Sequence, residues 1–336
     1  MMTIETGVHI PVMLEEVLAL MAPRHGGLYV DGTFGGGGYT RGILGEADCR
    51  VIGIDRDGVA LSHAAPMVKA YDGRLVLKHG RYAAMEALCQ QEGVAAADGV
   101  VLDLGVSSIQ LDDADRGFSF MHDGPLDMRM GGTGEPDSPS AADLVNTLSE
   151  ADLRRILFRY GEERRAGAVA RAIVERRAET PFSRTLDLAG LVEGVLGATP
   201  RGEAHAATRT FQALRIAVNA ELADLAQALS AAERLLAPGG RLVIVSFHSL
   251  EDRIVKTFLT HRCGHAPQGS RHAPPAPVQD DPSFRLLIKG VRTPGEAELA
   301  SNPRSRSAKM RAAQRTAAPP WAEDLSQLGI EEEDRR

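Results

Sequence analysis

Short apolar runs alternate with helix-length segments along the first third of the chain, and this alternation is its most constraining feature. The runs LYVDG, RVIGID, RLVLKHG and DGVVLDLG have the length of buried strands. Segments 57–71 and 83–93 between them have the length of helices. Strands separated by helices form βαβ units, whose strands lie parallel in one sheet. The pattern predicts an α/β, doubly wound, mostly parallel sheet.

The alternation stops at about residue 114 and resumes at about residue 211. Between these points we find loops and helical segments but no convincing strand. Apolar residues spaced by three and four from Phe211 to Leu236 then predict one long helix, and strands follow at 241–247 and 284–290. We therefore expect a discontinuous sheet domain over residues 1–113 and 211–316, with a helical insertion over residues 114–210. Residues 317–336 are expected to form a disordered acidic tail.

Composition indicates a folded cytoplasmic protein. Hydrophobic residues make up 43% and charged residues 25% of the 336 positions. The chain has no apolar run long enough to span a membrane and no secretory signal, so no membrane association is expected. Three scattered cysteines suggest a reducing compartment. Cys263 and the loosely spaced histidines near it make only a weak zinc signal, so no metal is expected.

The net charge of −7 hides two basic stretches. Segment 151–177 holds eight arginines against four acids, and segment 301–315 holds basic residues without an acid. Such stripes can bind phosphates in a chain of negative net charge, although solvated helix faces remain an alternative. The residues of these stretches that we expect to contact phosphates are Arg164, Arg165, Arg171, Arg304 and Arg306.

A glycine-rich loop, 28-LYVDGTFGGGGYT-40, follows the first predicted strand. It has no lysine after the glycines, which excludes a Walker phosphate loop, and Thr40 stands where an NAD-binding fingerprint needs its third glycine. S-adenosylmethionine carries a sulfonium and an ammonium group, so its sites benefit from acids at strand ends, such as Asp31, Asp55 and Asp103. These residues favour S-adenosylmethionine as the cofactor and leave NAD as the alternative.

Long blocks of the chain closely resemble the RsmH (MraW) family of ribosomal RNA small-subunit methyltransferases. The resemblance runs from about residue 9 to residue 316. The blocks that carry it include YVDGTFGGGG (29–38), LDLGVSSIQLDDADRGFSFMHDGPLDMRM (102–130), YGEERRAGAVARAIVERR (160–177), SFHSLEDRIVK (246–256) and NPRSRSAKMRAAQR (302–315). It implies a class I S-adenosylmethionine-dependent methyltransferase fold, Rossmann-like, with an inserted helical domain for RNA recognition.

The resemblance also implies a reaction and a partner. The family transfers a methyl group from S-adenosyl-L-methionine to the exocyclic N4 amine of a specific cytidine in 16S rRNA, near the decoding (P) site of the small ribosomal subunit. The expected partner is therefore 16S rRNA in that subunit. The sequence leaves the oligomeric state open, and a homodimer is compatible with it.

By position in the family's motifs, the cofactor contacts expected here are Gly37, Gly38, Tyr39, Asp55, Tyr82, Asp103 and Gln110. The enterobacterial form of the loop has an arginine and a histidine where this chain has Gly36 and Tyr39, so only backbone contacts are expected to carry over at those two positions.

Asp103 is our candidate for the catalytic residue. We expect its carboxylate to accept a hydrogen bond from the N4 amine or to orient the sulfonium; Asp113 and His248 are secondary candidates. The D-P-P-Y-type tetrapeptide typical of amino-methyltransferases is replaced here by Asp103-Leu104-Gly105-Val106. Three other classes are weighed: an NAD-dependent oxidoreductase, a non-catalytic RNA-binding protein and a DNA amino-methyltransferase.

Overall fold

The chain forms two compact units, each of which is described by itself. The computed structural model describes residues 11–132, 138–199, 204–265, 280–331 and 334. Unit 1 comprises Met1–Gly105 and Leu222–Arg335, and unit 2 comprises Val106–Glu221. The observed boundaries therefore differ from the predicted ones, 113/114 and 210/211. The helices on both sides of the predicted insertion, at 108–112 and 208–219, belong to unit 2.

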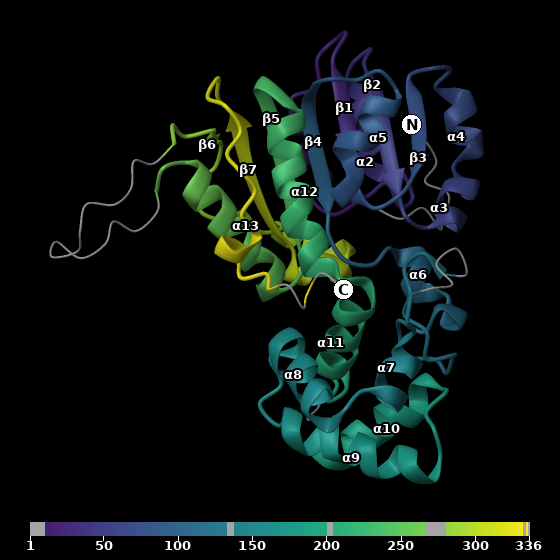
Figure 1. Ribbon diagram of the computed structural model, residues 1–336. Coiled ribbons are helices and arrows are strands. Elements are labelled where there is room, and N and C mark those ends of the chain that lie inside the picture. Colours follow the sequence, from purple (N-terminus) through teal and green to yellow (C-terminus); the bar gives the residue numbers. More distant parts are fainter. Residues whose placement is uncertain (1–10, 133–137, 200–203, 266–279, 332–333, 335–336) are drawn as a thin grey trace, which may run out of the picture. The chain divides into compact units, whose positions relative to one another are not determined.

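Unit 1 is built on a seven-stranded sheet in the described residues, with the strand order β3-β2-β1-β4-β5-β7-β6 (Figure 1). Neighbouring strands from β3 to β5 are parallel, as predicted, and β7 is antiparallel to both β5 and β6. The strands are β1 (Leu28–Asp31), β2 (Arg50–Asp55), β3 (Leu75–His79), β4 (Ala97–Asp103), β5 (Leu236–Ser246), β6 (Phe284–Leu286) and β7 (Lys309–Arg315).

Helices connect and cover these strands. They are α1 (Leu14–Met21), α2 (Gly38–Glu46), α3 (Gly58–His63), α4 (Ala65–Ala70), η1 (Tyr82–Ala84), α5 (Met85–Gln91), α12 (Glu221–Leu235, which begins at the boundary), α13 (Ser249–Arg262), α14 (Glu296–Ser301), η4 (Pro303–Ser307) and η5 (Leu325–Leu328). One core cluster joins Tyr29, Val101 and Val243 of the strands to Val17 of α1 and Ile43 of α2. The apolar runs that predicted strands are therefore buried on helix-covered faces.

The structure corrects the predicted strand at 284–290 and shows what two arginines of the last basic segment contact. The sequence predicted a strand over 284–290 and a phosphate-binding stretch over 301–315, but β6 ends at Leu286 and Lys309–Arg315 is strand β7. Arg311 of β7 pairs with Asp252 at 2.7 Å, and the buried Arg315 donates to the backbone carbonyls of Glu233 and Ser283. These arginines therefore satisfy groups of unit 1 itself.

The acidic tail also differs from its prediction, because its described part packs against unit 1. The guanidinium of Arg262 lies over the rings of both Trp321 and Phe258, at 4.7 and 5.0 Å from their centroids. Leu325 and Ile330 are buried. A few apolar residues thus order the described part of a terminal segment for which we expected disorder.

Unit 2 is helical. Its elements are α6 (Ser108–Asp112), η2 (Ala114–Arg116), α7 (Ala141–Thr147), α8 (Glu150–Gly161), α9 (Ala166–Glu179), α10 (Thr185–Leu196) and α11 (Thr208–Asn219) (Figure 1). No strand occurs in its described residues, as predicted, apart from an isolated bridge between Pro125 and Arg184. Its core joins Leu153 of α8, Val169 of α9 and Leu214 of α11.

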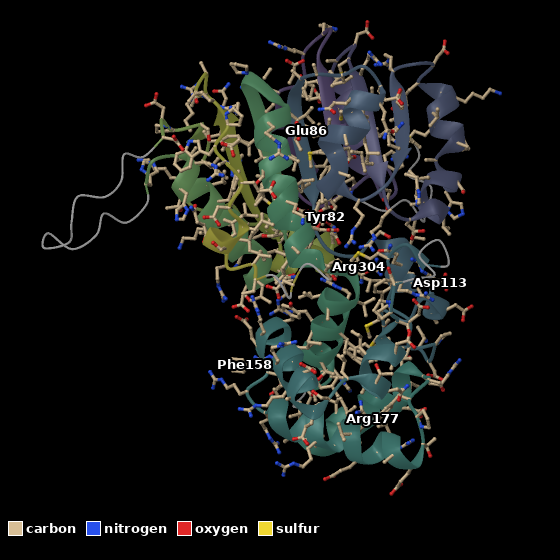
Figure 2. The ribbon with its side chains drawn as sticks, in the orientation of Figure 1. Tyr82, Glu86, Asp113, Phe158, Arg177 and Arg304 are labelled. Atoms are coloured by element: carbon tan, nitrogen blue, oxygen red, sulfur yellow. The ribbon has the colours of Figure 1, made fainter. Side chains whose placement is uncertain are left out.

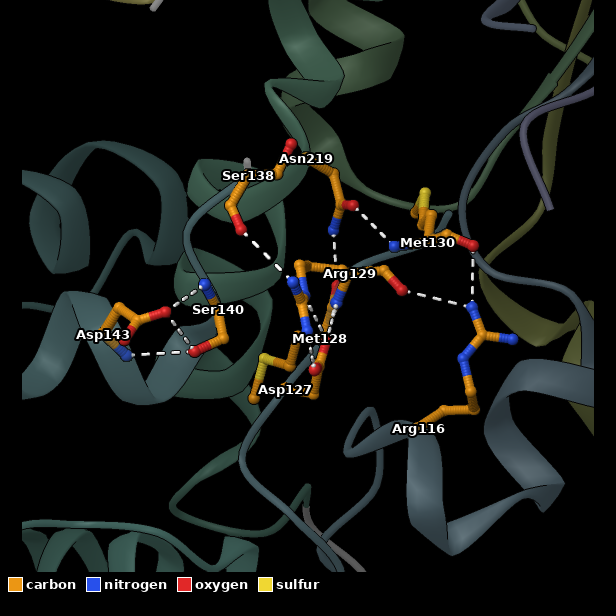
Figure 3. Close-up of polar contacts among 9 residues, drawn as sticks. All are labelled: Arg116, Asp127, Met128, Arg129, Met130, Ser138, Ser140, Asp143 and Asn219. Atoms are coloured by element: carbon orange, nitrogen blue, oxygen red, sulfur yellow. Dashed lines mark hydrogen bonds and ion pairs between the residues drawn. The ribbon is translucent and has the colours of Figure 1, made fainter. Parts of the chain in front are cut away.

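Asn219 fixes the end of the LDMRM block within unit 2 (Figure 3). Its side-chain amide donates to the carbonyl of Met128 and accepts from the amide of Met130, both at 2.8 Å. Arg116 donates to the carbonyls of Met130 at 2.7 Å and Arg129 at 3.1 Å. These bonds satisfy the backbone of a buried loop, which indicates that this part of the motif builds the unit's structure.

The predicted long helix is two helices. Ala220 has a φ of 51°, in the left-handed region, and separates α11 from α12. Glu221 forms a two-point ion pair with Arg215, at 2.8 and 2.9 Å, across this break. An alanine does not signal a break, so the periodicity alone could not locate it. None of the described helices has both the length and the apolar character that a membrane crossing requires.

Candidate active site at the carboxyl ends of the parallel strands

Three aspartates end three adjoining parallel strands in unit 1. Asp31 ends β1, Asp55 ends β2 and Asp103 ends β4. Because β1 lies between β2 and β4, the carboxyl ends of these strands meet at one edge of the sheet. Open α/β sheets bind their ligands at that edge. The structure thus brings together the three acids that the sequence singled out.

Asp55 holds the glycine loop in place. One carboxylate oxygen accepts a hydrogen bond from the amide of Gly35 at 2.7 Å, and the other accepts from the amide of Asp57 at 2.8 Å. Burial raises the pKa of Asp55, while these two bonds oppose the rise. Each oxygen retains acceptor capacity, so binding of ribose hydroxyls remains a prediction compatible with this geometry.

Three of the four loop glycines differ in the space that a side chain would find. A Cβ on Gly37 would lie 2.7 Å from the Phe34 ring, and this residue has a φ of 70°. A Cβ on Gly38 would lie 2.2 Å from Cγ of Pro11. A Cβ on Gly36 would meet nothing within 4 Å. The protein's own packing therefore explains Gly37 and Gly38, and it does not explain Gly36.

Tyr39 is a core residue of unit 1. Its ring is buried and its hydroxyl donates to the carbonyl of Val12. Burial, together with the charges of Asp103 and Asp31, raises the pKa of this phenol well above its usual value. The side chain thus serves to fasten the backbone at Val12, and a cofactor contact through the Tyr39 backbone stays a prediction.

Asp31 is buried beneath the loop. It accepts hydrogen bonds from the hydroxyl of Thr40 at 2.7 Å and from the amide of Thr33 at 3.3 Å. Burial raises the pKa of Asp31 to about 6, against the lowering effect of these bonds, and the neighbouring charge of Asp55 adds to the rise. Thr40, which counts against an NAD fingerprint, therefore has a structural task in this loop.

Asp103 has a buried carboxylate oxygen without a partner. Its amide donates to the hydroxyl of Thr33 at 2.6 Å, which fixes the backbone. Its Oδ1 has no hydrogen-bond partner among the described residues. Burial, with the charges of Asp31 and Glu251, raises the pKa of Asp103 well above its usual value. A buried acceptor without a partner is costly in a native protein and indicates a place for a ligand.

His248 begins α13, beyond the end of β5. Its Nδ1 accepts from the amide of Glu251 at 3.4 Å, and Glu251 accepts from the amides of Phe247 and His248 at 2.8 and 3.2 Å. This reciprocal capping box gives His248 a structural role. The imidazole Nε2 is buried, lies 3.2 Å from Glu251 Oε1 and makes no aligned hydrogen bond within the described residues. Glu251 was missed from the sequence, although the His-x-x-Glu spacing could have signalled it.

The remaining predicted residues lie in both units. Tyr82 begins η1 in unit 1 (Figure 2). A Cβ added to Gly32 would lie 3.3 Å from the Cβ of Tyr82, so Tyr82 lies beside the glycine loop. Gln110 and Asp113 lie in unit 2, where Gln110 closes a capping box with Ser107 and Asp113 caps η2. Their expected roles toward cofactor and substrate stay predictions.

The arginines proposed to bind RNA are exposed. Arg164 and Arg165 precede α9 and Arg171 lies within it, while Arg304 and Arg306 lie in η4 of unit 1. Arg171 is 3.9 Å from Glu150, too far for a strong ion pair. Exposure leaves these guanidinium groups accessible to phosphates.

The strand-end acids suit a cationic ligand. No lysine or arginine of the described chain forms an ion pair with Asp31, Asp55 or Asp103. A pyrophosphate would add negative charge to three carboxyl groups, whereas a sulfonium and an ammonium would neutralise it. The donor set therefore fits S-adenosylmethionine.

A sheet in which an antiparallel β7 lies between β5 and β6, with a glycine loop after β1, defines a class I methyltransferase. A model of the MraW methylase family matches residues 6–316, so this chain belongs to that family. The family assignment confirms the resemblance read from the sequence and decides against an NAD-dependent oxidoreductase.

Two named relatives agree with this assignment. The chain is 60% identical, over 93% of its length and 88% of the relative's, to the ribosomal RNA small subunit methyltransferase H of Xanthobacter autotrophicus. It is 56% identical to the protein of that name from Parvibaculum lavamentivorans, over 96% and 94% of the two chains. Among solved structures, a putative rRNA methylase from Clostridium thermocellum is similar with a TM-score of 0.42 and 12% identity, over 92% of this chain and all of that one.

Proposed function

We propose that this protein transfers a methyl group from S-adenosylmethionine to the exocyclic N4 amine of a cytidine in 16S rRNA, within the small ribosomal subunit in the cytoplasm. The family match and the names of the relatives support rRNA as the substrate class. The N4 position, and a target near the decoding (P) site, rest on the sequence resemblance. The observation that carries the chemistry is the buried, partnerless Oδ1 of Asp103.

In this proposal different residues of unit 1 bind different parts of the cofactor. S-adenosylmethionine supplies an electrophilic methyl group when it is bound. The loop after β1 provides backbone at Gly37 and Gly38, Asp55 accepts the ribose hydroxyls, and the ring of Tyr82 packs on the adenine. Asp31 is already satisfied by two threonines, so it contributes negative charge to the pocket without a direct contact.

Asp103 acts on the amine. The lone pair of the cytosine N4 is delocalised into the ring, so the amine must be rotated and aligned with the methyl group before it can attack. A hydrogen bond from N4 to Asp103 Oδ1 would hold that orientation, and alignment of this kind lowers a barrier by several kcal/mol, up to about 7–11. His248 positions the chain after β5, and its buried Nε2 is a second group that can meet the substrate.

The helical unit recognises RNA in this proposal. Exposed arginines at Arg164, Arg165 and Arg171 contact phosphates, and the target base leaves its stack to reach the methyl group, at a cost of a few kcal/mol. Reversing the charge of these three residues should weaken RNA binding and flatten its salt dependence. Unchanged binding would indicate that they form an ordinary solvated face.

The test uses labelled S-adenosylmethionine with unmodified small ribosomal subunits, free rRNA or DNA, followed by mapping of the label. We expect label on a cytidine N4 of the assembled subunit. Label on DNA alone, or none despite RNA binding, would overturn the proposal. Asp103→Ala removes the acceptor and should bind cofactor but transfer at least about 100-fold more slowly, because the amine is no longer held in line; a wild-type rate would remove Asp103 from the mechanism. Sedimentation of the same sample decides whether a homodimer forms.

A further inference from the structure

Phe158 is the feature of unit 2 that the proposed function leaves unexplained. Its side chain is 66% exposed near the end of α8 (Figure 2). The residues of α8 that form the core, Leu153 and Leu157, lie about 140° and 100° away from Phe158 around the helix. Exposing a phenyl ring to water forfeits about 1.5–3 kcal/mol of burial, so the position is not explained by the folding of unit 2.

Arginines flank Phe158 along the helix. Arg154 and Arg155 precede it by four and three residues, which places both beside the ring on the helix surface. Arg155 is paired with Asp152 at 3.2 Å. Arg154 is exposed and has no ion-pair partner within the part of the chain that the structure describes.

Arg154 extends this surface toward α9. A Cβ added to Gly167 of α9 would lie 3.8 Å from Cδ of Arg154. The aliphatic part of the Arg154 side chain therefore passes close to α9 at Gly167. Arg171 follows Gly167 by one helical turn and is exposed. The surface therefore consists of one aromatic ring with the guanidinium of Arg154, unpaired among the described residues, beside it and with Arg171, 3.9 Å from Glu150, further from the ring on α9. We call it the Phe158 surface (Phe158, Arg154, Arg171).

We propose that the Phe158 surface binds an unpaired nucleotide of the RNA substrate, with its base stacked on the Phe158 ring and its phosphates on Arg154 and Arg171. The proposal rests on the proposed function and adds a feature to it, namely that the helical unit reads single-stranded RNA. Aromatic rings set among basic residues are the means by which proteins hold single strands, because every base offers a face for stacking.

The charge beside the ring selects this occupant. A protein partner would be expected to cover a contiguous apolar patch, whereas the residues one turn from Phe158 are two arginines, one glutamate and one glycine: Arg154, Arg155, Glu162 and Gly161. Duplex RNA would use the arginines but not the ring, because its bases are stacked on one another. An unpaired nucleotide uses both.

The first test measures binding of the full-length protein to a short single-stranded oligoribonucleotide and to a duplex of the same length. Phe158→Ala should weaken single-strand binding by about 5- to 100-fold. It should leave duplex binding and the salt slope unchanged, and Phe158→Tyr should bind like the wild type. Arg154→Ala should instead weaken binding of both and reduce the salt slope by about 1. Leu186→Ala, at an exposed apolar residue of α10, is the matched control and should change nothing.

The second test reads stacking directly. Phe158→Trp should show fluorescence quenching on addition of the single strand, and Leu186→Trp should not. Wild-type single-strand affinity in Phe158→Ala, or an equal loss on duplex and single strand, overturns the proposal. So does a defect confined to assembled subunits, which would assign the ring to a ribosomal protein. Methyl transfer by the wild type is measured separately: if it fails while Phe158 still binds RNA, the proposed function is wrong and this inference stands.

Discussion

At the scale of single residues, the loop after β1 is shaped by the protein's own packing. Pro11 occupies the space that a side chain on Gly38 would need, and Phe34 does the same at Gly37. The hydroxyl of Tyr39 fastens Val12 to this loop. Glycine at these two positions therefore lets Pro11 and Phe34 lie directly against the backbone of the loop.

Gly38→Ala and Gly36→Ala should consequently differ in stability. The methyl group on residue 38 must displace Pro11, and overpacking of this kind costs about 1–3 kcal/mol. At residue 36 it meets open space. Urea unfolding of both variants measures the difference in the free energy of unfolding. Equal midpoints would show that Pro11 yields without cost.

Asp31 should make the stability of the cofactor-free protein depend on pH. Its pKa is raised from 3.8 to about 6, so between these values the native carboxyl binds more protons than the unfolded one. The free energy of unfolding therefore falls as pH rises from about 4 to 6, by up to about 3 kcal/mol, and stays lower above that.

Asp31→Asn does not titrate and can keep a bond to Thr40, so it is the reference for this effect. The wild type should lose stability relative to the variant as the pH rises from 4 to 7, as measured by unfolding at several pH values. A constant difference between the two proteins would show that the Asp31 pKa is not raised.

At the scale of elements, Ala220 decides where one helix ends and the next begins. Its left-handed conformation costs a residue with a side chain about 1–2 kcal/mol, and glycine is free of that cost. Ala220→Gly should therefore stabilise the protein by about 1 kcal/mol. Ala178→Gly, at an exposed position in the regular helix α9, should destabilise it by about 0.5–1 kcal/mol. Thermal unfolding compares the two, and the same sign for both would contradict this account.

Elements were predictable where one physical signal dominated. The strands β1 to β4 follow from apolar runs, and α8 from its Ser149 cap with an amphipathic pattern. Strand β7 was missed because its buried residues are one methionine, two adjacent alanines and Arg315, set among basic side chains that resemble a phosphate-binding stretch. The ion pairs of Arg311 and the carbonyl contacts of Arg315 are tertiary facts, and no local pattern contains them.

In the candidate site, too, some features could be predicted from the sequence and others depend on tertiary packing. The three strand-end acids and the loop could be found from sequence because the carboxyl edge of a parallel sheet is a general binding place. The partnerless oxygen of Asp103, the cap formed by His248 with Glu251 and the burial of Tyr39 depend on packing across the sheet. Residue identity alone could not separate these roles.

At the scale of the whole molecule, the tail stabilises unit 1 from a distance in sequence. Removal of residues 319–336 should lower the free energy of unfolding by several kcal/mol, because it exposes the site of Leu325 and Ile330 and leaves Arg262 without the Trp321 ring. Denaturant unfolding followed by circular dichroism measures the loss.

Trp321→Phe keeps an aromatic ring over Arg262 but loses the hydrogen bond from the indole to the carbonyl of Asp281, which is 2.9 Å long. It should cost about 1 kcal/mol. If the shortened chain unfolds at the wild-type midpoint, the tail contributes nothing to unit 1.

The position of β7 has a consequence for synthesis of the chain. β5 lies in the middle of the sheet but receives its second neighbour only when residues 309–315 have left the ribosome. Until then its edge, rich in valine and isoleucine, presents unpaired backbone groups to the cell, and edges of this kind recruit other strands. A nascent chain stalled between β5 and β7 should therefore be the species most prone to aggregate and most dependent on chaperones.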